Sequence, residues 1–186
     1  MIDHKKLRQR YNPDGSKLRQ AQMELLEMLM FVDDICKRNN IKWWLSSGTL
    51  IGAARHNGFI PWDDDLDIAM LKSDYKRLKK ILRNLDSKEY VLHDMESDVD
   101  YVNVFGKFRK REGTIHSTSL RYNYYKWRGI GFDIFAIEKN NYFAARAASV
   151  IYGNLQHITS YIKLSWLRKP LIRLIEILCL GIINPI

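Results

Sequence analysis

The stretch WWLSSGTLIGAARHNGFIPWDDDLDIAM, residues 43–70, places four aspartates within five positions, directly before an apolar segment. In an extended strand, alternate side chains share a face, so Asp65 and Asp67 are predicted to lie together. The apolar residues expected on the other face, toward a core, are Leu66, Ile68 and Met70. Two neighbouring carboxylates repel each other unless a cation or a proton lies between them, and an oxygen-only pair suits a hard ion such as Mg²⁺. This pattern predicts a metal site.

The acidic run has two other interpretations, a solvated loop and a calcium site. A run of acidic residues is often a solvated loop, and that alternative stays open on the aspartates alone. A calcium loop of the EF-hand type needs Gly at its sixth position and Glu at its twelfth, whereas counting from Asp63 gives Ile68 and Asp74. The calcium interpretation is therefore weak.

The turn before the acidic run favours the metal site. Ser46 is followed by Ser47, Gly48 and Thr49, and a short helical run follows. A glycine at such a turn lets backbone N–H groups approach a phosphate, and the helix start adds a favourable dipole. Ser47, Gly48 and Thr49 are therefore predicted to bind phosphate.

A third carboxylate, Asp133, lies inside the apolar, β-prone run Gly131-Phe132-Asp133-Ile134-Phe135. A buried aspartate is costly without a partner, so this position points to a function. Asp133 is predicted to be the third metal ligand beside Asp65 and Asp67. A hydrogen bond to a neighbouring turn is the structural alternative.

Three cations are candidates for contact with a phosphorylated ligand. Lys107 and Arg109 alternate within a predicted strand and share a face. If that face also carries the aspartates, they would neutralise donor phosphates; otherwise they are solvent-exposed. Arg55 is predicted to act as a phosphate clamp, because guanidinium offers a planar set of donors.

These residues resemble the signature of the LicD family, within the nucleotidyltransferase-fold superfamily, and the resemblance runs from about Leu18 to Glu138. It implies an α+β fold, with a nucleotidyltransferase-like mixed β-sheet packed by helices. The superfamily has a Gly-Ser or Gly-Thr turn, an Asp-x-Asp pair on the next strand and a later third carboxylate. The family also has a Lys near Lys107. Where the family usually reads Asp-Ile-Phe-Pro, this chain has Ala136 in place of Pro, which affects the following loop rather than the carboxylate.

The resemblance also implies an activity. Family members similar to this chain transfer phosphocholine or a sugar phosphate from a cytidine diphosphate (CDP) donor to a glycan hydroxyl. The expectation is Mg²⁺-dependent transfer to a cell-surface glycan such as lipopolysaccharide or teichoic acid, with Mn²⁺ as the alternative ion. Asp133 is favoured as the general base and Asp63 is the alternative. Two other functions stay open: a nucleotidyltransferase acting on a small sugar phosphate, and a non-catalytic nucleotide-binding module.

Composition predicts a globular, single-domain chain. Its 186 residues are 46% hydrophobic and 27% charged, and its net charge is +9. That charge favours phosphorylated ligands or anionic lipid, but no dense basic and aromatic run predicts a nucleic-acid partner. The two separated cysteines and the N-terminus without an apolar core predict a cytoplasmic protein, with the inner face of the membrane as an alternative location.

Periodicity predicts the elements and their grouping. A helix is expected from Leu18 to Cys36, capped by Ser16 and ended by Asn39-Asn40, and a second helix is expected after a cap at Ser73 or Asp74. The predicted strands are Ile41–Leu45, the segment with Asp65 and Asp67, Tyr90–His93, Tyr101–Arg109, Thr114–Ser117 and the segment with Asp133.

The predicted catalytic domain covers residues 1–139, and residues 140–186 are predicted to form a helical C-terminal extension. No run of 18 uncharged residues predicts a membrane span. Peripheral membrane contact through these helices and packing onto the domain both stay open. Family members usually continue further, so a chain that is either short or truncated at its C-terminus is expected.

Overall fold

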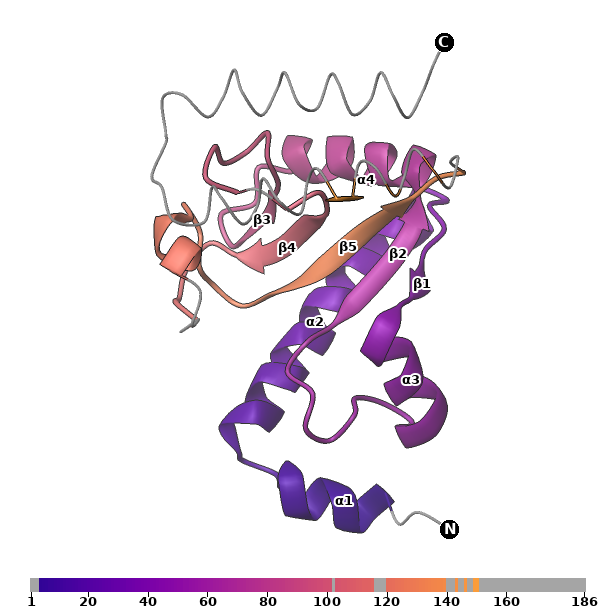
Figure 1. Cartoon of the computed structure of the whole chain (residues 1–186), viewed down its shortest axis with the longest axis vertical. Helices are drawn as coiled ribbons and strands as arrows, with labels where there is room; N and C mark the ends of the chain where they lie inside the picture. The colour runs from indigo at the N-terminus through magenta and orange to yellow at the C-terminus, as the bar shows by residue number, and fades with distance from the viewer. Residues whose placement is uncertain are drawn as a thin grey trace.

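The computed structural model describes residues 4–101, 103–115, 120–139, 143, 146 and 149–150. These residues form one mixed β-sheet with helices packed on it (Figure 1). The helices are α1 (His4–Tyr11), α2 (Lys17–Arg38), α3 (Ser47–His56), α4 (Lys72–Asn84) and the 3-10 helix η1 (Leu120–Tyr124). The strands are β1 (Trp44–Leu45), β2 (Asp67–Leu71), β3 (Tyr90–His93), β4 (Gly106–Lys110) and β5 (Gly131–Ile137).

The sheet contains five strands in the order β1-β2-β5-β4-β3. The central pair, β2 and β5, is parallel, and the other neighbouring strands are antiparallel. The predicted α+β class with a mixed, nucleotidyltransferase-like sheet is confirmed.

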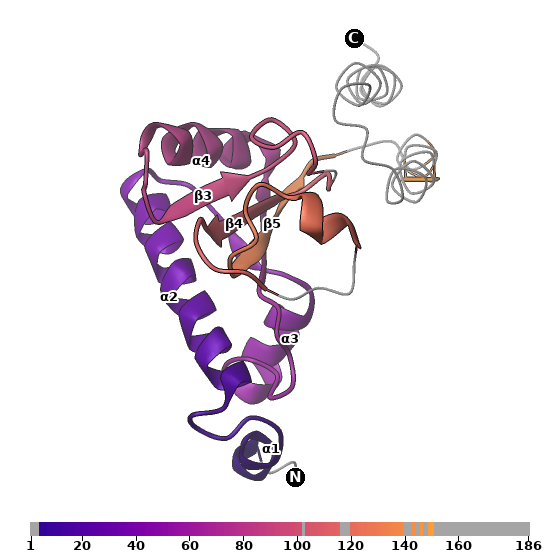
Figure 2. The same cartoon turned by 90° about the vertical axis from the view of Figure 1, so that its left-hand side faces the viewer.

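One face of the sheet forms the hydrophobic core with α2 and α4, which lie together on that side (Figure 2). Leu66 is buried just before β2, and Ile68 and Met70 are buried within it, as their alternation predicts. The core residues of the other strands are Leu92, Phe108, Phe132 and Ile134. Since successive side chains of a strand alternate, the residues between these face the opposite side. That second face carries the polar residues described below.

Helix α2 begins and ends where the sequence predicts. The Ser16 hydroxyl accepts a hydrogen bond from the Arg19 N–H at 3.1 Å, and Asn40 adopts the left-handed conformation with φ 50°. The N–H of Ile41 donates to the Cys36 carbonyl at 2.9 Å. Because this bond keeps Ile41 at the helix end, β1 begins later, at Trp44, and the predicted strand from Ile41 is too long.

Three further boundaries differ from the prediction. Strand β2 begins at Asp67, so Asp65 precedes the strand instead of lying within it. Strand β4 begins at Gly106 instead of Tyr101, whose N–H donates to the Asp98 carbonyl in a turn. Helix α4 starts after Leu71 without a side-chain cap, so neither Ser73 nor Asp74 is the cap residue.

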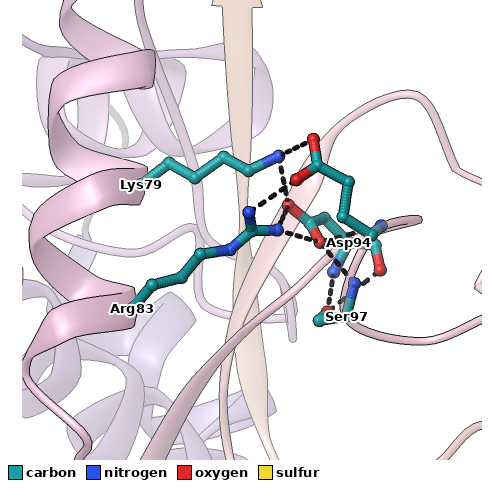
Figure 3. Close-up of polar contacts among 5 residues, drawn as sticks. Lys79, Arg83, Asp94 and Ser97 are labelled. Carbon is teal, nitrogen blue, oxygen red and sulfur yellow. Dashed lines mark hydrogen bonds and ion pairs between the residues drawn. The ribbon is translucent and has the colours of Figure 1, made fainter.

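The loop after β3 is bound to α4 by a cluster of charges (Figure 3). Asp94 Oδ2 lies 2.8 Å from Lys79 Nζ, and Asp94 Oδ1 lies 3.0 Å from Arg83 Nη2. Burial alone would raise the pKa of Asp94, but the hydrogen bond from Lys79 and the charges of Lys79 and Arg83 hold it below the ordinary value. This cluster fixes the start of the loop after β3 against α4.

The predicted helical extension, residues 140–186, lies almost wholly outside the described residues. Four of its positions, Phe143, Arg146, Ser149 and Val150, are described, and all four are helical. The division at residue 139 and membrane contact through this extension therefore stay predictions. Among the described helices, none is both long and apolar enough to cross a membrane.

Candidate functional site

A row of polar residues crosses the face of the sheet opposite α2 and α4. Asp67 on β2 is the register partner of Asp133 on β5, Asp133 pairs with Lys107 on β4, and Lys107 pairs with His93 on β3. Residues directly opposite each other on neighbouring strands share a face. Asp67 and Asp133, separated in sequence, are therefore adjacent on parallel strands, as the sequence predicts.

The carboxylates of Asp67 and Asp133 are partly buried and close enough for their charges to interact. Burial, followed by the negative charge of Asp133, raises the pKa of Asp67. Burial also raises the pKa of Asp133, and the Lys107 ammonium only partly offsets this. The negative charge of Asp65 raises the pKa of both Asp67 and Asp133 further. Removing water from adjacent like charges makes the site attractive to a cation.

Lys107 is the cation nearest to Asp133, with its Nζ 2.9 Å from Asp133 Oδ1. Both side chains are about one-fifth exposed, at 21% for Lys107 and 19% for Asp133. The contact is an ion pair: Asp133 Oδ1 accepts no hydrogen bond of good geometry from the described residues. Lys107 thus lies on the face that carries the aspartates. The sequence alone left open whether it would lie there or on a solvent-exposed face.

The turn at Ser47, Gly48 and Thr49 is bound to the start of β2. The Asp67 N–H donates to Thr49 Oγ1 at 2.8 Å, and the Ser46 N–H donates to the Asp67 carbonyl at 3.0 Å. The Ser47 side chain forms a hydrogen bond with Asp67, which opposes the rise in the pKa of that carboxyl. Two hydroxyls predicted to bind phosphate therefore also orient Asp67.

Gly48 lies against the acidic run. A Cβ atom at this position would be 2.9 Å from Asp63 Oδ2, closer than van der Waals contact allows. The glycine therefore permits the close approach of the turn to the Asp63 carboxylate. Helix α3 begins at Ser47, so its first N–H groups and the acidic run lie near each other.

Carboxylate oxygens of Asp63, Asp64 and Asp65 lie within 4.8 Å of one another. Among the described residues this trio meets that spacing, whereas the predicted trio of Asp65, Asp67 and Asp133 does not. Burial raises the pKa of Asp63, a backbone hydrogen bond from Asp65 opposes this, and the charge of Asp65 adds to the rise. Asp65 belongs to this trio, and its charge also raises the pKa of Asp67 and of Asp133.

The other two candidate cations differ from Lys107 in their contacts. Arg55 is exposed in the last turn of α3, about 12 Å along the helix from Ser47 at 1.5 Å per residue. Arg109 is 1% exposed, and its Nη1 donates to the Tyr122 hydroxyl and to the Trp127 carbonyl at 2.9 Å each. Arg109 therefore supports the segment around η1, and its charge also acts to lower the pKa of Asp133. The structure does not bring Arg55 to the carboxylates.

The residues of the row fit a divalent ion. Asp67 and Asp133 offer oxygen donors on adjacent strands, and Asp65 is close enough to affect the pKa of both. One buried oxygen of Asp133, Oδ1, has no well-formed hydrogen bond among the described residues. Oxygen-only donors suit Mg²⁺ or Mn²⁺. The three predicted ligands and the choice of metal remain predictions.

Two features of the site region were missed by the sequence reasoning. Gln22 and Asn12 are buried polar residues beside the acidic run: Gln22 donates to the Asp63 carbonyl, and Asn12 donates to the Gln22 side chain. Gln22 interrupts the apolar stripe of α2 between Leu18 and Leu25, which was the available signal. His93 is fully buried, with its Nε2 2.7 Å from Asp98 Oδ2, and no sequence pattern indicated that partner.

Comparison with known proteins gives concordant results. Residues 40–168 match the family model described as "LicD/FKTN/FKRP, nucleotidyltransferase domain". The lipopolysaccharide cholinephosphotransferase LicD of Haemophilus influenzae is 48% identical over 60 residues, which are 32% of this chain and 23% of that protein. The human ribitol 5-phosphate transferase FKRP is 38% identical over 50 residues, or 27% of this chain and 10% of that protein.

A longer match is to the Rickettsia prowazekii protein RP689, 37% identical over 83 residues, or 45% of this chain and 30% of that protein. The matched segments thus span less than a third of each of these relatives. The family model, in contrast, covers more than half of this chain, and it includes the turn, the acidic run, Lys107 and Asp133. The chain therefore belongs to the LicD/FKTN/FKRP family of nucleotidyltransferase domains.

Proposed function

We propose that this chain transfers a phosphorylated group, such as phosphocholine, from a CDP-activated donor to a hydroxyl of a cell-surface glycan. The observation that carries the proposal is the pairing of Asp67 and Asp133 on adjacent parallel strands, with Lys107 beside Asp133. Two relatives support this class of reaction by name, one a lipopolysaccharide cholinephosphotransferase and the other a ribitol 5-phosphate transferase.

Phosphoryl transfer depends on positioning and charge neutralisation more than on covalent chemistry. Asp65, Asp67 and Asp133 would hold Mg²⁺, which supplies charge neutralisation for the donor diphosphate and the leaving nucleotide. The Ser47-Gly48-Thr49 turn would orient Asp67 and offer N–H groups to phosphate oxygens. Lys107 would add a positive charge beside the transferred group. Arg55 stays a weaker candidate because of its place at the far end of α3.

The acceptor hydroxyl must lose its proton as the new bond forms. Asp133 is the favoured base because it lies on a central strand, and Asp63 is the alternative beside Gly48. Burial raises the pKa of both carboxyls, which makes each a better proton acceptor than an exposed aspartate. Replacing each aspartate in turn distinguishes them. A rate lost by removing the general base is partly restored at alkaline pH, whereas a rate lost for another reason is not.

Labelled CDP-choline, Mg²⁺ and a lipopolysaccharide or teichoic acid acceptor test the proposal. Label on the glycan together with released CMP is the expected result, and Asp67→Asn should reduce the rate at least a hundredfold. The control is Asp34→Asn, an exposed aspartate of α2 paired with Arg38, which should keep the full rate. Transfer of the nucleotide itself would indicate a nucleotidyltransferase. Binding without turnover would indicate a nucleotide-binding module.

A further inference from the structure

Gln22 is a buried amide with partners on both sides. Its side chain lies on the core face of α2 and is 1% exposed. Its Nε2 donates to the Asp63 carbonyl at 2.8 Å and to the Ile60 carbonyl at 3.2 Å. Its Oε1 accepts from Asn12 Nδ2 at 2.7 Å and from Arg19 Nη1 at 3.2 Å. The amide group therefore has two donor and two acceptor contacts and one orientation that satisfies them all.

The two carbonyls that Gln22 binds belong to the turn that starts the acidic run. The Asp63 N–H donates to the Ile60 carbonyl at 3.0 Å and closes this turn. Beyond it, the carboxylates of Asp63, Asp64 and Asp65 are crowded within 4.8 Å, and their repulsion favours spreading of the loop. The hydrogen bonds from Gln22 oppose that spreading by tying the loop backbone to α2, which Figure 1 shows passing beside this loop.

Asn12 extends the support to the N-terminal segment. Its Oδ1 accepts from Ser16 Oγ at 2.6 Å, and the same Ser16 oxygen caps α2. Asn12 is fully buried. The position of the acidic run is thus set by a continuous chain of hydrogen bonds from the start of α2 to the Asp63 carbonyl.

We infer that Gln22 is a positioning residue for the metal site: by fixing the backbone at Ile60 and Asp63, it sets how far Asp65 reaches toward Asp67 and Asp133. The inference rests on the proposed function, in which these carboxylates hold a divalent ion. Outer partners of metal ligands typically change metal affinity by 10- to 100-fold when they are removed. A purely structural Gln22 would alter stability alone and leave the affinity of the folded protein unchanged.

Mn²⁺ binding to the full chain, measured by calorimetry without donor at a temperature where every variant is folded, tests this role. Gln22→Met should weaken Mn²⁺ binding by about tenfold. The matched control is Gln20→Met, two residues away, where the exposed amide donates to the Gly15 carbonyl. A second control, Leu29→Ala, destabilises the same helix through the core without touching the loop. Both controls should bind Mn²⁺ as the unsubstituted chain does.

Asn12→Ala provides an independent variant in case Gln22→Met does not fold. It removes one contact that orients the Gln22 amide, and a smaller loss of affinity, roughly threefold, is expected. Unchanged affinity in folded Gln22→Met, or an equal loss in Leu29→Ala, would overturn the inference while leaving the proposed function intact. If Gln22→Met does not fold, unchanged affinity in Asn12→Ala overturns it. Absence of Mn²⁺ binding to the unsubstituted chain would overturn the metal site, and this inference with it.

Discussion

At the scale of single residues, the pairing of Lys107 with Asp133 has a consequence for metal affinity. The Lys107 ammonium lies 2.9 Å from the Asp133 carboxylate, where a divalent ion would also be attracted. The lysine and the metal therefore compete for the same negative charge. A unit positive charge about 4 Å from a divalent ion repels it by about 2 kcal/mol even in water, so removing that charge should strengthen metal binding by about this amount.

Lys107→Met is accordingly expected to bind Mg²⁺ or Mn²⁺ more tightly without donor, by roughly thirtyfold, and yet to transfer more slowly. The slower rate would follow because a charge beside the donor phosphates is lost. Calorimetry and a transfer assay measure the two effects separately. Lys110→Met is the control: Lys110 is on the same strand but faces α2, with its Nζ 2.6 Å from Glu24 Oε1. Weaker metal binding in Lys107→Met would show that Lys107 does not compete with the ion.

Some residues of the site could be predicted from the sequence, and others could not. Asp133 could be predicted because a carboxylate inside an apolar β-prone run is costly to bury without a role. Its proximity to Asp67 followed from strand alternation together with the family resemblance. The pairing of His93 with Asp98, five residues later, could not be predicted, because no periodic pattern indicates it. The burial of Arg109 could not be predicted because it depends on contacts with Tyr122 and Trp127, which lie in a later segment.

At the scale of elements, α3 and the loop after it are held together at Gly52. A Cβ atom at this position would lie 2.5 Å from the Gly58 carbonyl oxygen and 2.9 Å from the Ile60 nitrogen. Both are backbone atoms, so the loop itself would have to move.

Gly52→Ala should therefore lower the free energy of unfolding by roughly 1–3 kcal/mol, although alanine is the better helix former. Because the Ile60 carbonyl accepts the hydrogen bond that closes the turn at Asp63, Mn²⁺ binding should weaken as well. Thermal denaturation and calorimetry check the two effects, and Ala54→Ser, at an exposed position of the same helix, is the control. A variant as stable as the unsubstituted chain would contradict the close packing of this loop on α3.

The cluster that binds α4 to the loop after β3 predicts a pH dependence (Figure 3). The pKa of Asp94 in the folded chain lies below the ordinary value of 3.8. An ionised Asp94 therefore stabilises the fold above the unfolded-state pKa, and this contribution is lost as pH falls through the folded-state pKa.

Asp94→Asn should lower the free energy of unfolding by about 2 kcal/mol at neutral pH, the value of a hydrogen bond to a charged group. The difference from the unsubstituted chain should shrink as the pH falls through the folded-state pKa of Asp94, because a protonated aspartate is as neutral as asparagine. Urea unfolding at neutral and at successively more acidic pH measures this. Glu138→Gln, which removes a more exposed ion pair with Lys72, should change stability by less than about 1 kcal/mol. A difference that persists in acid would contradict the electrostatic origin.

Element boundaries were harder to predict than element types. Strand β1 is short because Ile41 completes the end of α2, a choice decided by one backbone hydrogen bond. Helix α1 was not predicted, since it buries no residue and so leaves no apolar stripe in the sequence. Asp65 precedes β2, and the loop before it is tied to Gln22 of α2, a contact between residues far apart in sequence.

At the scale of the whole molecule, the sheet places the candidate site on the face that α2 and α4 leave uncovered (Figure 2). The apolar alternation of each strand predicts this division, because it assigns one face to the core and the other to polar residues. The order of the strands, with β5 between β2 and β4, could not be derived from periodicity. That order is what brings Asp67, Asp133 and Lys107 into one row.

The central claim is that Asp65, Asp67 and Asp133 share one divalent ion on this face. The most direct test is a crystal structure with Mn²⁺ and a CDP donor, in which anomalous scattering locates the metal. The expected result is one Mn²⁺ ion bonded to carboxylate oxygens of Asp67 and Asp133, with Asp65 as the third ligand. An ion held by Asp63, Asp64 and Asp65 without Asp133 would contradict it.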